Sequence, residues 1–592
     1  MTLTTARPVA YGVGALGMSG ALIDEGVVFP RDVIAGYASS GLWCQRDIFS
    51  ILEDVAGQTP DKPLIVDRFG SLSYASALQQ SELIARNLAA LGVRPGDRMA
   101  VQLPNWRHFP LLEYAAARLG AIMVPLPPIY RQRELRLMLG LAAPVVAVCA
   151  EIFRGFDHAA MFRELQQEVP VIRHLIVAGD STPAGALPFD RLLAPCDADL
   201  PPLPDPNAIT EIAFTSGTTG EPKGVMHTAN TLLSTLTGLA DDQKLGADTV
   251  ILMASTFGHQ TGFAFGGQLP VLLGGTVVLM ERWEAKDGIA LIDREKVTWM
   301  MGATPFLQDV TEAVEAGAGH CSSLEVFLCS GAPVPRPLLA KANTVLRAKV
   351  VSGWGMTEVG LATLTRIDDR PERIVGSDGR PLPGMEIRVV DAEDQPLPCA
   401  VEGELQCRGP SVFAGYWQRP ELTAASFAAG STPSESGWLR TGDRAQRDVD
   451  GYIRITGRSK DIIVRGGENI PVVEVEDLLH KHPDVLRVAI VAVPDPRFQE
   501  RACAVIVPRE GAAFDISKMR AYLESVRLAR QYFPEHLVVL ADLPMTPSGK
   551  VQKFLLRKTV LEIIGLADVT FPQTMSVATV RQSNCESRPN EE

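Results

Sequence analysis

Short apolar runs alternate with amphipathic stretches over the first 350 residues. Segments 99–102, 145–149, 250–253 and 276–280 have the length of strands, whereas 78–91 repeats its apolar positions at helical spacing. Alternating strands and helices are typical of parallel sheets covered by helices on both faces. The pattern therefore predicts an α/β fold for this part of the chain.

The pattern changes after Pro381. Segments 386–390, 403–408 and 452–456 are short and β-type, and Gly and Pro turns separate them, which predicts a small β-rich subdomain. Beyond Gly457 a compact α+β unit of ordinary domain size is expected. Its predicted elements are a strand at 461–464, a helix at 473–480, strands at 488–493 and 502–507, a helix from Ile516 and a strand at 537–540.

Five regions follow from this pattern. We expect an N-terminal extension at 1–45, a large domain at 46–457, a short connection at 458–461, which the family resemblance described below implies to be a hinge, a small domain at 462–562 and a polar tail at 563–592, predicted to be disordered.

Composition narrows the class of protein. The chain has 592 residues, 46% of them hydrophobic and 21% charged, with a net charge of -13, which fits a soluble globular protein and disfavours nucleic acid as a partner. No apolar run approaches the ~20 residues that span a bilayer, so the longest, 141–150 and 270–280, are interpreted as buried strands. Nine scattered cysteines without a CxxC pair predict a reduced, cytoplasmic protein with no zinc site.

A glycine-rich segment at the N-terminus carries no function in this interpretation. Gly12, Gly14 and Gly17 match G-x-G-x-x-G, but no strand precedes them and no helix with a later acidic residue follows.

A second glycine-rich segment has the chemistry of a phosphate loop. It follows the strand-like 211–214 and precedes a helix from about Asn230. Small residues let backbone N–H groups surround phosphate oxygens, hydroxyls add donors and a lysine adds positive charge. No Walker sequence occurs, which argues against a kinase or GTPase. The candidate residues are Thr215, Ser216, Gly217, Thr218, Thr219, Gly220 and Lys223.

Five motifs in order resemble those of the adenylate-forming superfamily, which includes acyl- and aryl-CoA synthetases. They are the loop at 215–224, Gly353-Trp354-Gly355-Met356-Thr357-Glu358, Thr441-Gly442-Asp443, Gly457-Arg458-Ser459-Lys460-Asp461 and Pro547-Ser548-Gly549-Lys550. The resemblance covers roughly residues 45–560. It implies a large N-terminal domain of two parallel-type sheets with helices and a β-rich subdomain, followed by a small mobile α+β C-terminal domain.

The resemblance also implies roles in binding ATP and Mg²⁺. Glu358 supplies a hard carboxylate for Mg²⁺ and Thr357 a hydroxyl beside the phosphates. Asp443 accepts from the ribose hydroxyls and Arg458 donates to sugar or phosphate, although the two also fit a structural ion pair. The adenine side is lined by Gly331, Ala332, Pro333, Trp354, Gly355 and Met356, and Trp354 fits a core position equally well.

Lys550 is the implied catalytic lysine, bridging the substrate carboxylate and the α-phosphate. An exposed loop lysine is otherwise an ordinary surface residue. Lys460 matches the hinge, about which the small domain swings between two half-reactions. The swing would bring in Gly466, Gly467 and Glu468 to form a coenzyme A tunnel.

The acyl pocket is expected around His259, Gly353 and Gly355. Gly258 and His259 stand where amino-acid-activating relatives carry an aspartate, which disfavours an amino-acid substrate. Acetate-activating relatives carry tryptophan at Gly355, so this pocket is expected to admit larger acids. His259 also fits a satisfied, partly buried histidine.

The implied function is ATP-dependent activation of a medium-chain, alicyclic or aromatic acid to acyl-AMP, with release of pyrophosphate, and then thioester formation with coenzyme A. The segment 466–476 looks most like cyclohexanecarboxylate-type and medium-chain acyl-CoA ligases. The alternative is a ligase that transfers the acyl group to a carrier protein or an amine. The sequence also leaves open whether the protein forms a homodimer.

Overall fold

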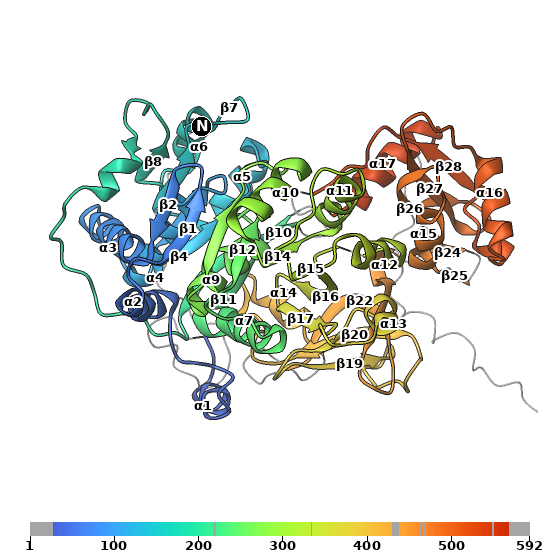
Figure 1. Ribbon diagram of the computed structural model, residues 1–592, viewed down its shortest axis with the longest axis horizontal. Helices are drawn as coiled ribbons and strands as arrows, with labels where there is room; N and C mark the ends of the chain where they lie inside the picture. Colours follow the sequence, from blue (N-terminus) through green and yellow to red (C-terminus); the bar gives the residue numbers. More distant parts are fainter. Residues whose placement is uncertain are drawn as a thin grey trace, which may run out of the picture. The chain divides into compact units, whose positions relative to one another are not determined.

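The computed structural model describes residues 28–216, 221–332, 334–428, 437–461, 463–465, 468–546 and 550–566. The described chain divides into two compact units (Figure 1). The first runs to Ser459 and includes the short segment Met545–Lys550, and the second comprises the rest from Lys460 onward. The division falls inside the predicted hinge. The candidate dinucleotide motif at Gly12–Gly17 and most of the polar tail lie outside the described residues.

A nine-stranded sheet forms one layer of the first unit. Its central strands pair in parallel and are buried on both faces, which explains their continuous apolar sequence. In spatial order the strands are β18 (Arg380–Pro381), β17 (Gly360–Leu364), β16 (Lys349–Met356), β15 (Val326–Cys329), β14 (Trp299–Gly302), β12 (Val250–Met253), β13 (Thr276–Leu279), β1 (Pro63–Asp67) and β2 (Gly70–Ser73).

An eight-stranded sheet forms a second layer. Its parallel strands are continued at one side by an antiparallel hairpin. In order the strands are β21 (Gly415–Tyr416), β11 (Pro222–Thr228), β10 (Ile209–Ser216), β4 (Ile122–Pro125), β3 (Arg98–Gln102), β5 (Val146–Ala150), β8 (His174–Ala178) and β9 (Leu187–Pro188), and β6 (Ile152–Phe153) and β7 (Phe156–Asp157) form a separate pair.

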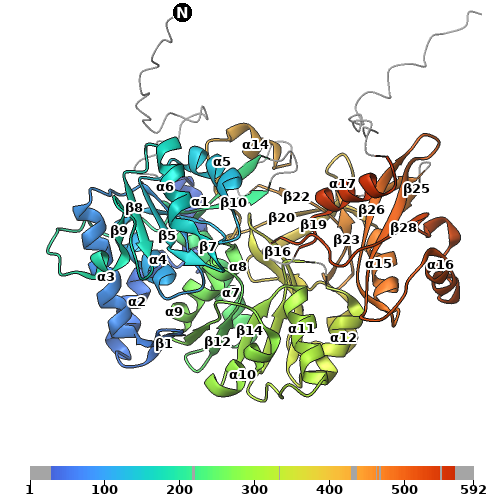
Figure 2. The same ribbon diagram turned by 90° about the horizontal axis from the view of Figure 1, so that it is seen from above.

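Helices separate and cover the two sheets, as Figure 2 shows for α10, α11 and α12 beside β12 and β14. The outer helices are α10 (Ala285–Glu295), α11 (Thr304–Glu315) and α12 (Arg336–Val345) on the nine-stranded sheet, and α5 (Gln132–Ala142) and α6 (His158–Glu168) on the eight-stranded sheet. The largest buried cluster joins the two sheets through α2 (Ile48–Gln58), α3 (Tyr74–Ala90), α4 (His108–Leu119), α7 (Ala229–Gln243) and α9 (Leu269–Leu273).

Shorter helices complete the first unit. They are α1 (Arg31–Ser39), η1 (Phe189–Leu193), α8 (Gln260–Gly262), the π-helix η2 (Phe263–Gln268), α13 (Pro371–Gly376), α14 (Pro420–Ala425) and, across the boundary between the units, η4 (Ser459–Asp461).

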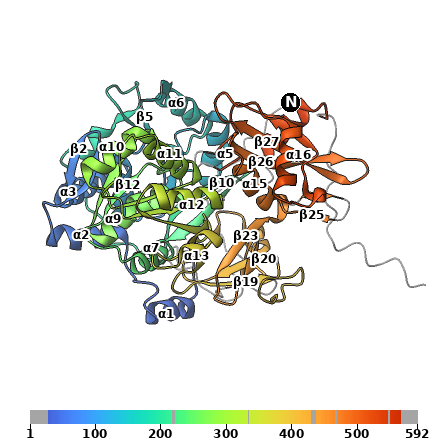
Figure 3. The same cartoon turned by 45° about the vertical axis from the view of Figure 1, so that its right-hand side comes forward.

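The predicted β-rich subdomain is a four-stranded antiparallel sheet of β19 (Glu386–Val390), β20 (Gly403–Arg408), β22 (Leu439–Arg447) and β23 (Ile453–Arg458), seen beside α13 in Figure 3. Leu405, Leu439 and Ile453 extend the main core into this sheet. The subdomain is therefore continuous with the large unit.

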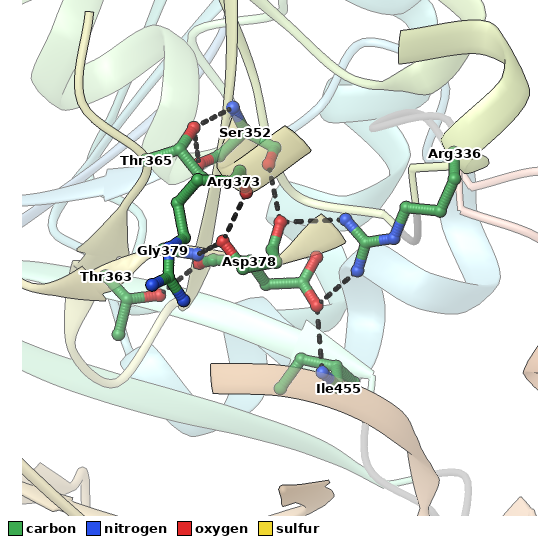
Figure 4. Close-up of polar contacts among 9 residues, drawn as sticks. Arg336, Ser352, Thr363, Thr365, Arg373, Asp378, Gly379 and Ile455 are labelled. Atoms are coloured by element: carbon green, nitrogen blue, oxygen red, sulfur yellow. Dashed lines mark hydrogen bonds and ion pairs between the residues drawn. The ribbon is translucent and has the colours of Figure 1, made fainter. Parts of the chain in front are cut away.

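Asp378 joins the subdomain to the nine-stranded sheet (Figure 4). Its carboxylate accepts from Arg336 at 2.7 Å and from the backbone N–H of Ile455 at 2.8 Å, while its carbonyl accepts from Thr363 at 2.7 Å. Arg336 also donates to the Ser377 carbonyl at 2.8 Å. These bonds fix β23 against β17, which pairs with β16, the strand that carries candidate site residues.

The second unit is the expected α+β fold, in orange and red in Figure 1. One face of its sheet packs on the helices around Val475, Met519 and Leu523. The sheet contains β24 (Ile463–Arg465), β25 (Glu468–Ile470), β26 (Val485–Asp495), β27 (Gln499–Pro508) and β28 (His536–Val539), and the helices are α15 (Val472–His480), α16 (Ile516–Ser525), η5 (Arg530–Tyr532) and α17 (Lys553–Ile563).

Two predicted strand regions are partly helical. The apolar run 141–150 begins at the end of α5, and only Val146–Ala150 forms β5. The apolar run 270–280 begins in α9 and only its second half forms β13, so the interpretation of the whole run as strand is wrong. In the described part of the chain no helix is long and apolar enough to cross a membrane.

Candidate functional site

The predicted phosphate loop joins the two strands of the β10–β11 hairpin. Thr215 pairs with Lys223 and Ser216 with Pro222, so the hairpin register brings the two ends of the loop together. Gly217, Thr218, Thr219 and Gly220, like Pro333 on the adenine side, lie outside the described residues.

Lys223 at the base of this loop faces an aromatic ring. Its Nζ lies 5.0 Å from the ring centroid of Tyr416, and the Tyr416 hydroxyl donates to Oε1 of Glu358 at 2.8 Å. Burial raises the pKa of Tyr416, which keeps the hydroxyl protonated as a donor. The loop lysine and the candidate metal-binding carboxylate are thus linked through one tyrosine, which the motifs did not identify.

The backbone of Thr357 is held by a second residue that sequence reasoning missed. Nε2 of His227 donates to the Thr357 carbonyl at 2.7 Å. His227 is buried, and burial lowers its pKa to about 4, so the ring is neutral at ordinary pH. Its position four residues after Lys223 was the available signal, but a lone buried histidine is more often a core residue.

Trp354, Asp443 and Arg458 form a connected group. Nε1 of Trp354 donates to Oδ2 of Asp443 at 2.8 Å, and Arg458 pairs with Oδ1 at 2.9 Å. Asp443 is buried, whereas the Arg458 side chain is 42% exposed. The structural ion pair weighed from the sequence is present, and Trp354 orients the same carboxylate. A carboxylate has about four acceptor positions, so Asp443 can still receive hydroxyl donors.

Two neighbouring glycines pack tightly against β17. A Cβ at Gly355 would lie 2.0 Å from the Gly360 carbonyl oxygen, and one at Gly353 would lie 2.8 Å from the Thr363 carbonyl oxygen. The space beside Gly355 is therefore filled by backbone. The packing of β16 on β17 therefore requires glycine at both positions.

Gly355→Ala is expected to destabilise the first unit by about 3 kcal/mol, because a new methyl group would collide with backbone that cannot rotate away. Thermal or urea unfolding measures the change. Gly57→Ala is the matched control, since nothing lies within 4 Å of its Cβ position, and equal stability of the two variants would contradict the assignment.

The turn at 330–332 is sterically open. Gly331 has φ +88°, a conformation that favours glycine, and nothing lies within 4 Å of its Cβ position. Ala332, the next residue, is half-buried. Met356, at the end of β16, is also half-buried.

His259 precedes α8, and its Nε2 is buried without a hydrogen-bond partner in the described residues. Burial and, to a lesser extent, the positive charge of Lys550 together lower its pKa to about 4. Lys550 belongs to the Met545–Lys550 segment, which packs with the first unit. Its backbone N–H donates to Thr546 Oγ1 at 2.9 Å, closing the turn. The structure thus brings Lys550 within electrostatic range of His259.

The remaining predicted residues are only partly described. Lys460 lies in η4 at the start of the second unit, without a described side chain. Glu468 is described as backbone in β25, whereas Gly466 and Gly467 lie outside the described residues.

Two buried glutamates were missed altogether. Glu211 on β10 is 0% exposed and Glu113 on α4 is 2% exposed. Burial raises the pKa of Glu211 to about 8, opposed by the neighbouring Gln260 amide, and raises that of Glu113 well above its usual range, with the Glu211 charge adding to the rise. Both are therefore largely protonated near pH 7.

Stability is expected to depend on pH through Glu211. In the unfolded chain the carboxyl ionises near pH 4.5, and in the folded chain near pH 8, so its contribution falls as pH rises between these values. The free energy of unfolding of Glu211→Gln, measured relative to that of the parent protein, is expected to increase by about 3 kcal/mol when the pH is raised from 5.5 to 8. Urea unfolding at both pH values tests this. If the difference in unfolding free energy between variant and parent is the same at both pH values, the prediction is wrong. Glu510→Gln, at an exposed position, is the control.

Two family models match the chain. "AMP-binding enzyme" covers residues 52–417, and "AMP-binding enzyme C-terminal domain" covers residues 474–550. The medium-chain fatty-acid–CoA ligase of Escherichia coli is 35% identical over 89% of this chain and 93% of its own. The salicyl-AMP ligase / salicyl-S-ArCP synthetase of Mycobacterium tuberculosis is 33% identical over 91% of this chain and 95% of its own.

Solved structures agree with these matches. ATP-bound MatB of Rhodopseudomonas palustris has a TM-score of 0.78 and 27% identity, covering 88% of this chain and 99% of its own. The amide bond synthetase McbA of Marinactinospora thermotolerans has a TM-score of 0.76 and 28% identity, covering 87% of this chain and 99% of its own.

Proposed function

Because the chain belongs to the AMP-binding enzyme family of adenylate-forming ligases, we propose that it activates a medium-chain, alicyclic or aromatic carboxylic acid with ATP and transfers the acyl group to coenzyme A. The linked group Lys223, Tyr416 and Glu358, at the base of the phosphate loop, is the observation that carries the proposal. This group contains a cation, which would attract phosphate oxygens, and a carboxylate, which would hold an Mg²⁺ ion shared with them.

In the first half-reaction a carboxylate oxygen of the acid attacks the α-phosphorus of ATP. A new P–O bond forms, and the bond to the β-phosphate breaks, so pyrophosphate leaves with the electron pair. The loop residues and Lys223 hold the departing phosphates, and Thr357 donates beside them. Lys550 lies between the two reacting anions and offsets their repulsion.

Glu358 suits Mg²⁺ bound together with ATP. Mg²⁺ is commonly held by one or two carboxylates plus substrate phosphates. Among the described residues no cluster of three His, Cys, Asp or Glu side chains could hold a metal alone, which fits a single carboxylate sharing the ion with ATP. When bound, Mg²⁺ would offset phosphate charge.

Asp443 and Arg458 hold the ribose in this proposal, and Trp354 keeps the Asp443 carboxylate oriented while its ring borders the adenine side. The adenine side is completed by Gly331, Ala332, Pro333, Gly355 and Met356. Because Asp443 already has two protein donors, it is fixed before the nucleotide arrives, which reduces the entropy lost on binding.

In the second half-reaction the thiol sulfur attacks the acyl carbonyl carbon, a thioester bond forms, and AMP leaves with the electrons of the anhydride bond. Thiols ionise near pH 8.5, so no strong dedicated base is needed. We assign Lys460 as the hinge, and Gly466, Gly467 and Glu468 as the tunnel for coenzyme A. The E. coli relative, a fatty-acid–CoA ligase, favours this acceptor.

A carrier protein or an amine is the alternative acceptor. The salicyl-S-ArCP synthetase and the amide bond synthetase among the similar proteins favour it. The adenylation residues would be unchanged, so only the acceptor distinguishes the two functions.

The proposal is tested by measuring pyrophosphate release with ATP and Mg²⁺. The acids are acetate, octanoate, cyclohexanecarboxylate, benzoate and several amino acids, each with and without coenzyme A. Acid-dependent release that coenzyme A accelerates, with thioester formed, is the expected result. Release indifferent to coenzyme A would instead support the alternative acceptor. No release with any acid would refute adenylation.

A further inference from the structure

A groove of about 560 Å³ opens between α13 and the β22–β23 pair, wholly within the first unit. Four arginines contribute to its lining: Arg370 and Arg373 at the start of α13, Arg447 on β22 and Arg454 on β23. Cavities of this size commonly accommodate small ligands. None of the lining residues belongs to the five motifs that bear on adenylation.

The groove is separate from the candidate adenylation site. Asp443 pairs with Arg458 at one end of the β22–β23 ladder, and Arg447 pairs with Ile453 at the other. Asp443 and Arg447 are therefore separated by about 13 Å of strand. A ligand in the groove and a nucleotide at Asp443 can be bound at the same time.

Three of these arginines have no side-chain partner in the described part of the chain. The guanidinium groups of Arg370, Arg447 and Arg454 form neither a hydrogen bond nor an ion pair there. Arginine stays protonated at ordinary pH and carries several N–H donors in a rigid fork. The groove therefore gathers fixed positive charge and donors that no described protein group accepts.

The acidic side chains of the groove do not neutralise this charge. They are Glu372 and Asp448. Oδ2 of Asp448 pairs with Arg373, and Oδ1 accepts from the backbone N–H groups of Asp450 at 3.0 Å and Tyr452 at 2.9 Å. Of the lining acids, only Glu372 is left against the three unpartnered arginines. The whole chain carries a net charge of -13, so a cationic groove differs from the protein around it.

One wall of the groove is held rigidly. The Arg373 guanidinium lies 4.4 Å from the ring centroid of Tyr452 and is paired with Asp448. The Tyr452 hydroxyl donates to Asp369 at 2.5 Å, and the Ser377 hydroxyl donates to the Arg373 carbonyl at 2.9 Å. A wall that is fixed before a ligand arrives reduces the entropy lost on binding.

We propose that this groove binds the phosphate group of a small phosphate ester, at a site distinct from the one that binds ATP. A phosphate presents its acceptor oxygens tetrahedrally, so it can accept from arginines that approach from α13, β22 and β23. A planar carboxylate is matched by the fork of a single arginine. The chemistry of the lining therefore favours a phosphate.

A nucleotide is the disfavoured ligand. Tyr452, the aromatic residue of the lining, is 7% exposed, and its ring faces the Arg373 guanidinium. A base would find no open aromatic face on which to stack. The volume nevertheless exceeds what a bare phosphate ion fills, so the expected ligand is a compact, non-aromatic ester such as a sugar phosphate.

Isothermal titration calorimetry on the full-length protein tests the proposal. Saturating ATP, with no acid present, occupies the adenylation site and prevents turnover. Glycerol 3-phosphate, glucose 6-phosphate and fructose 1,6-bisphosphate are the probes, and glycerol, glucose and citrate are the comparison compounds. We expect at least one ester to bind at one site per chain, with an affinity that falls as the NaCl concentration is raised, and no binding of glycerol or glucose.

Arg447→Gln combined with Arg454→Gln is expected to raise the dissociation constant of that ester at least about 10-fold, because charge-assisted hydrogen bonds are lost. Pyrophosphate release should be unchanged. Arg133→Gln combined with Arg347→Gln is the matched control, since both side chains are exposed and unpartnered in the described residues, and its affinity should stay within about 2-fold of the parent.

Should the Arg447 and Arg454 double variant fail to fold, Arg370→Gln alone replaces it, with the same direction of change expected. Absence of binding by every ester would overturn the proposal. Equal affinity in the parent and the double variant would also overturn it, because the ester would then bind elsewhere. Tighter binding of citrate than of every ester would overturn it in favour of a carboxylate site. Pyrophosphate release is measured separately, so each of these outcomes leaves the proposed function standing.

Discussion

Replacing Lys550 with alanine is expected to lower acid-dependent pyrophosphate release by about 10²- to 10³-fold. The change removes the positive charge between two mutually repelling anions, and the loss of one preorganised stabilising group has effects of this size. The KM for ATP should change little, since the loop residues and Lys223 remain. Initial rates at saturating ATP and Mg²⁺ measure the effect.

The control for this variant lies three residues away. Lys553 pairs with Glu476 at 2.8 Å within the second unit, so Lys553→Ala should leave the rate within about 2-fold. A synthetic acyl-AMP supplied with coenzyme A should still give thioester with the Lys550 variant. Equal loss in both half-reactions would mean that the substitution damages folding and would contradict the assigned role.

Glu358→Gln is expected to lower the rate about 10²-fold and to raise the Mg²⁺ concentration needed for half-maximal activity. The amide keeps an acceptor for the Tyr416 hydroxyl but has no charge for Mg²⁺. A Mg²⁺ titration of pyrophosphate release at fixed ATP measures both effects.

Tyr416→Phe separates orientation from charge. It removes the hydrogen bond to Glu358 but leaves the ring beneath Lys223, so a loss of about 10-fold with little change in Mg²⁺ dependence is expected. If Glu358→Gln shows the parent rate and Mg²⁺ dependence, the carboxylate does not serve the metal.

Local signals predicted most elements correctly. Strand β12 spans the residues that the apolar run 250–253 marks, and strand β20 matches 403–408, because alternation and turn residues act over a few positions. The prediction of a strand over 270–280 was wrong because a short apolar run has no periodicity that distinguishes a buried helix from a buried strand.

The motifs likewise identified residues but not their partners. Glu358 and Asp443 were predicted as functional, yet their bonds to Tyr416 and Trp354 join residues 58 and 89 positions apart. A pattern along the chain says which face of an element is buried and does not say which distant element covers it.

The sequence by itself determined the α/β class, the two-unit organisation expected of its motifs and the family to which the chain belongs. Only the tertiary structure placed Glu211 and Glu113 together in the core, where burial rather than sequence sets their charge state. Glutamate is ordinarily a surface residue. Desolvation arises only when distant elements close around it, so no local pattern could have signalled this buried pair.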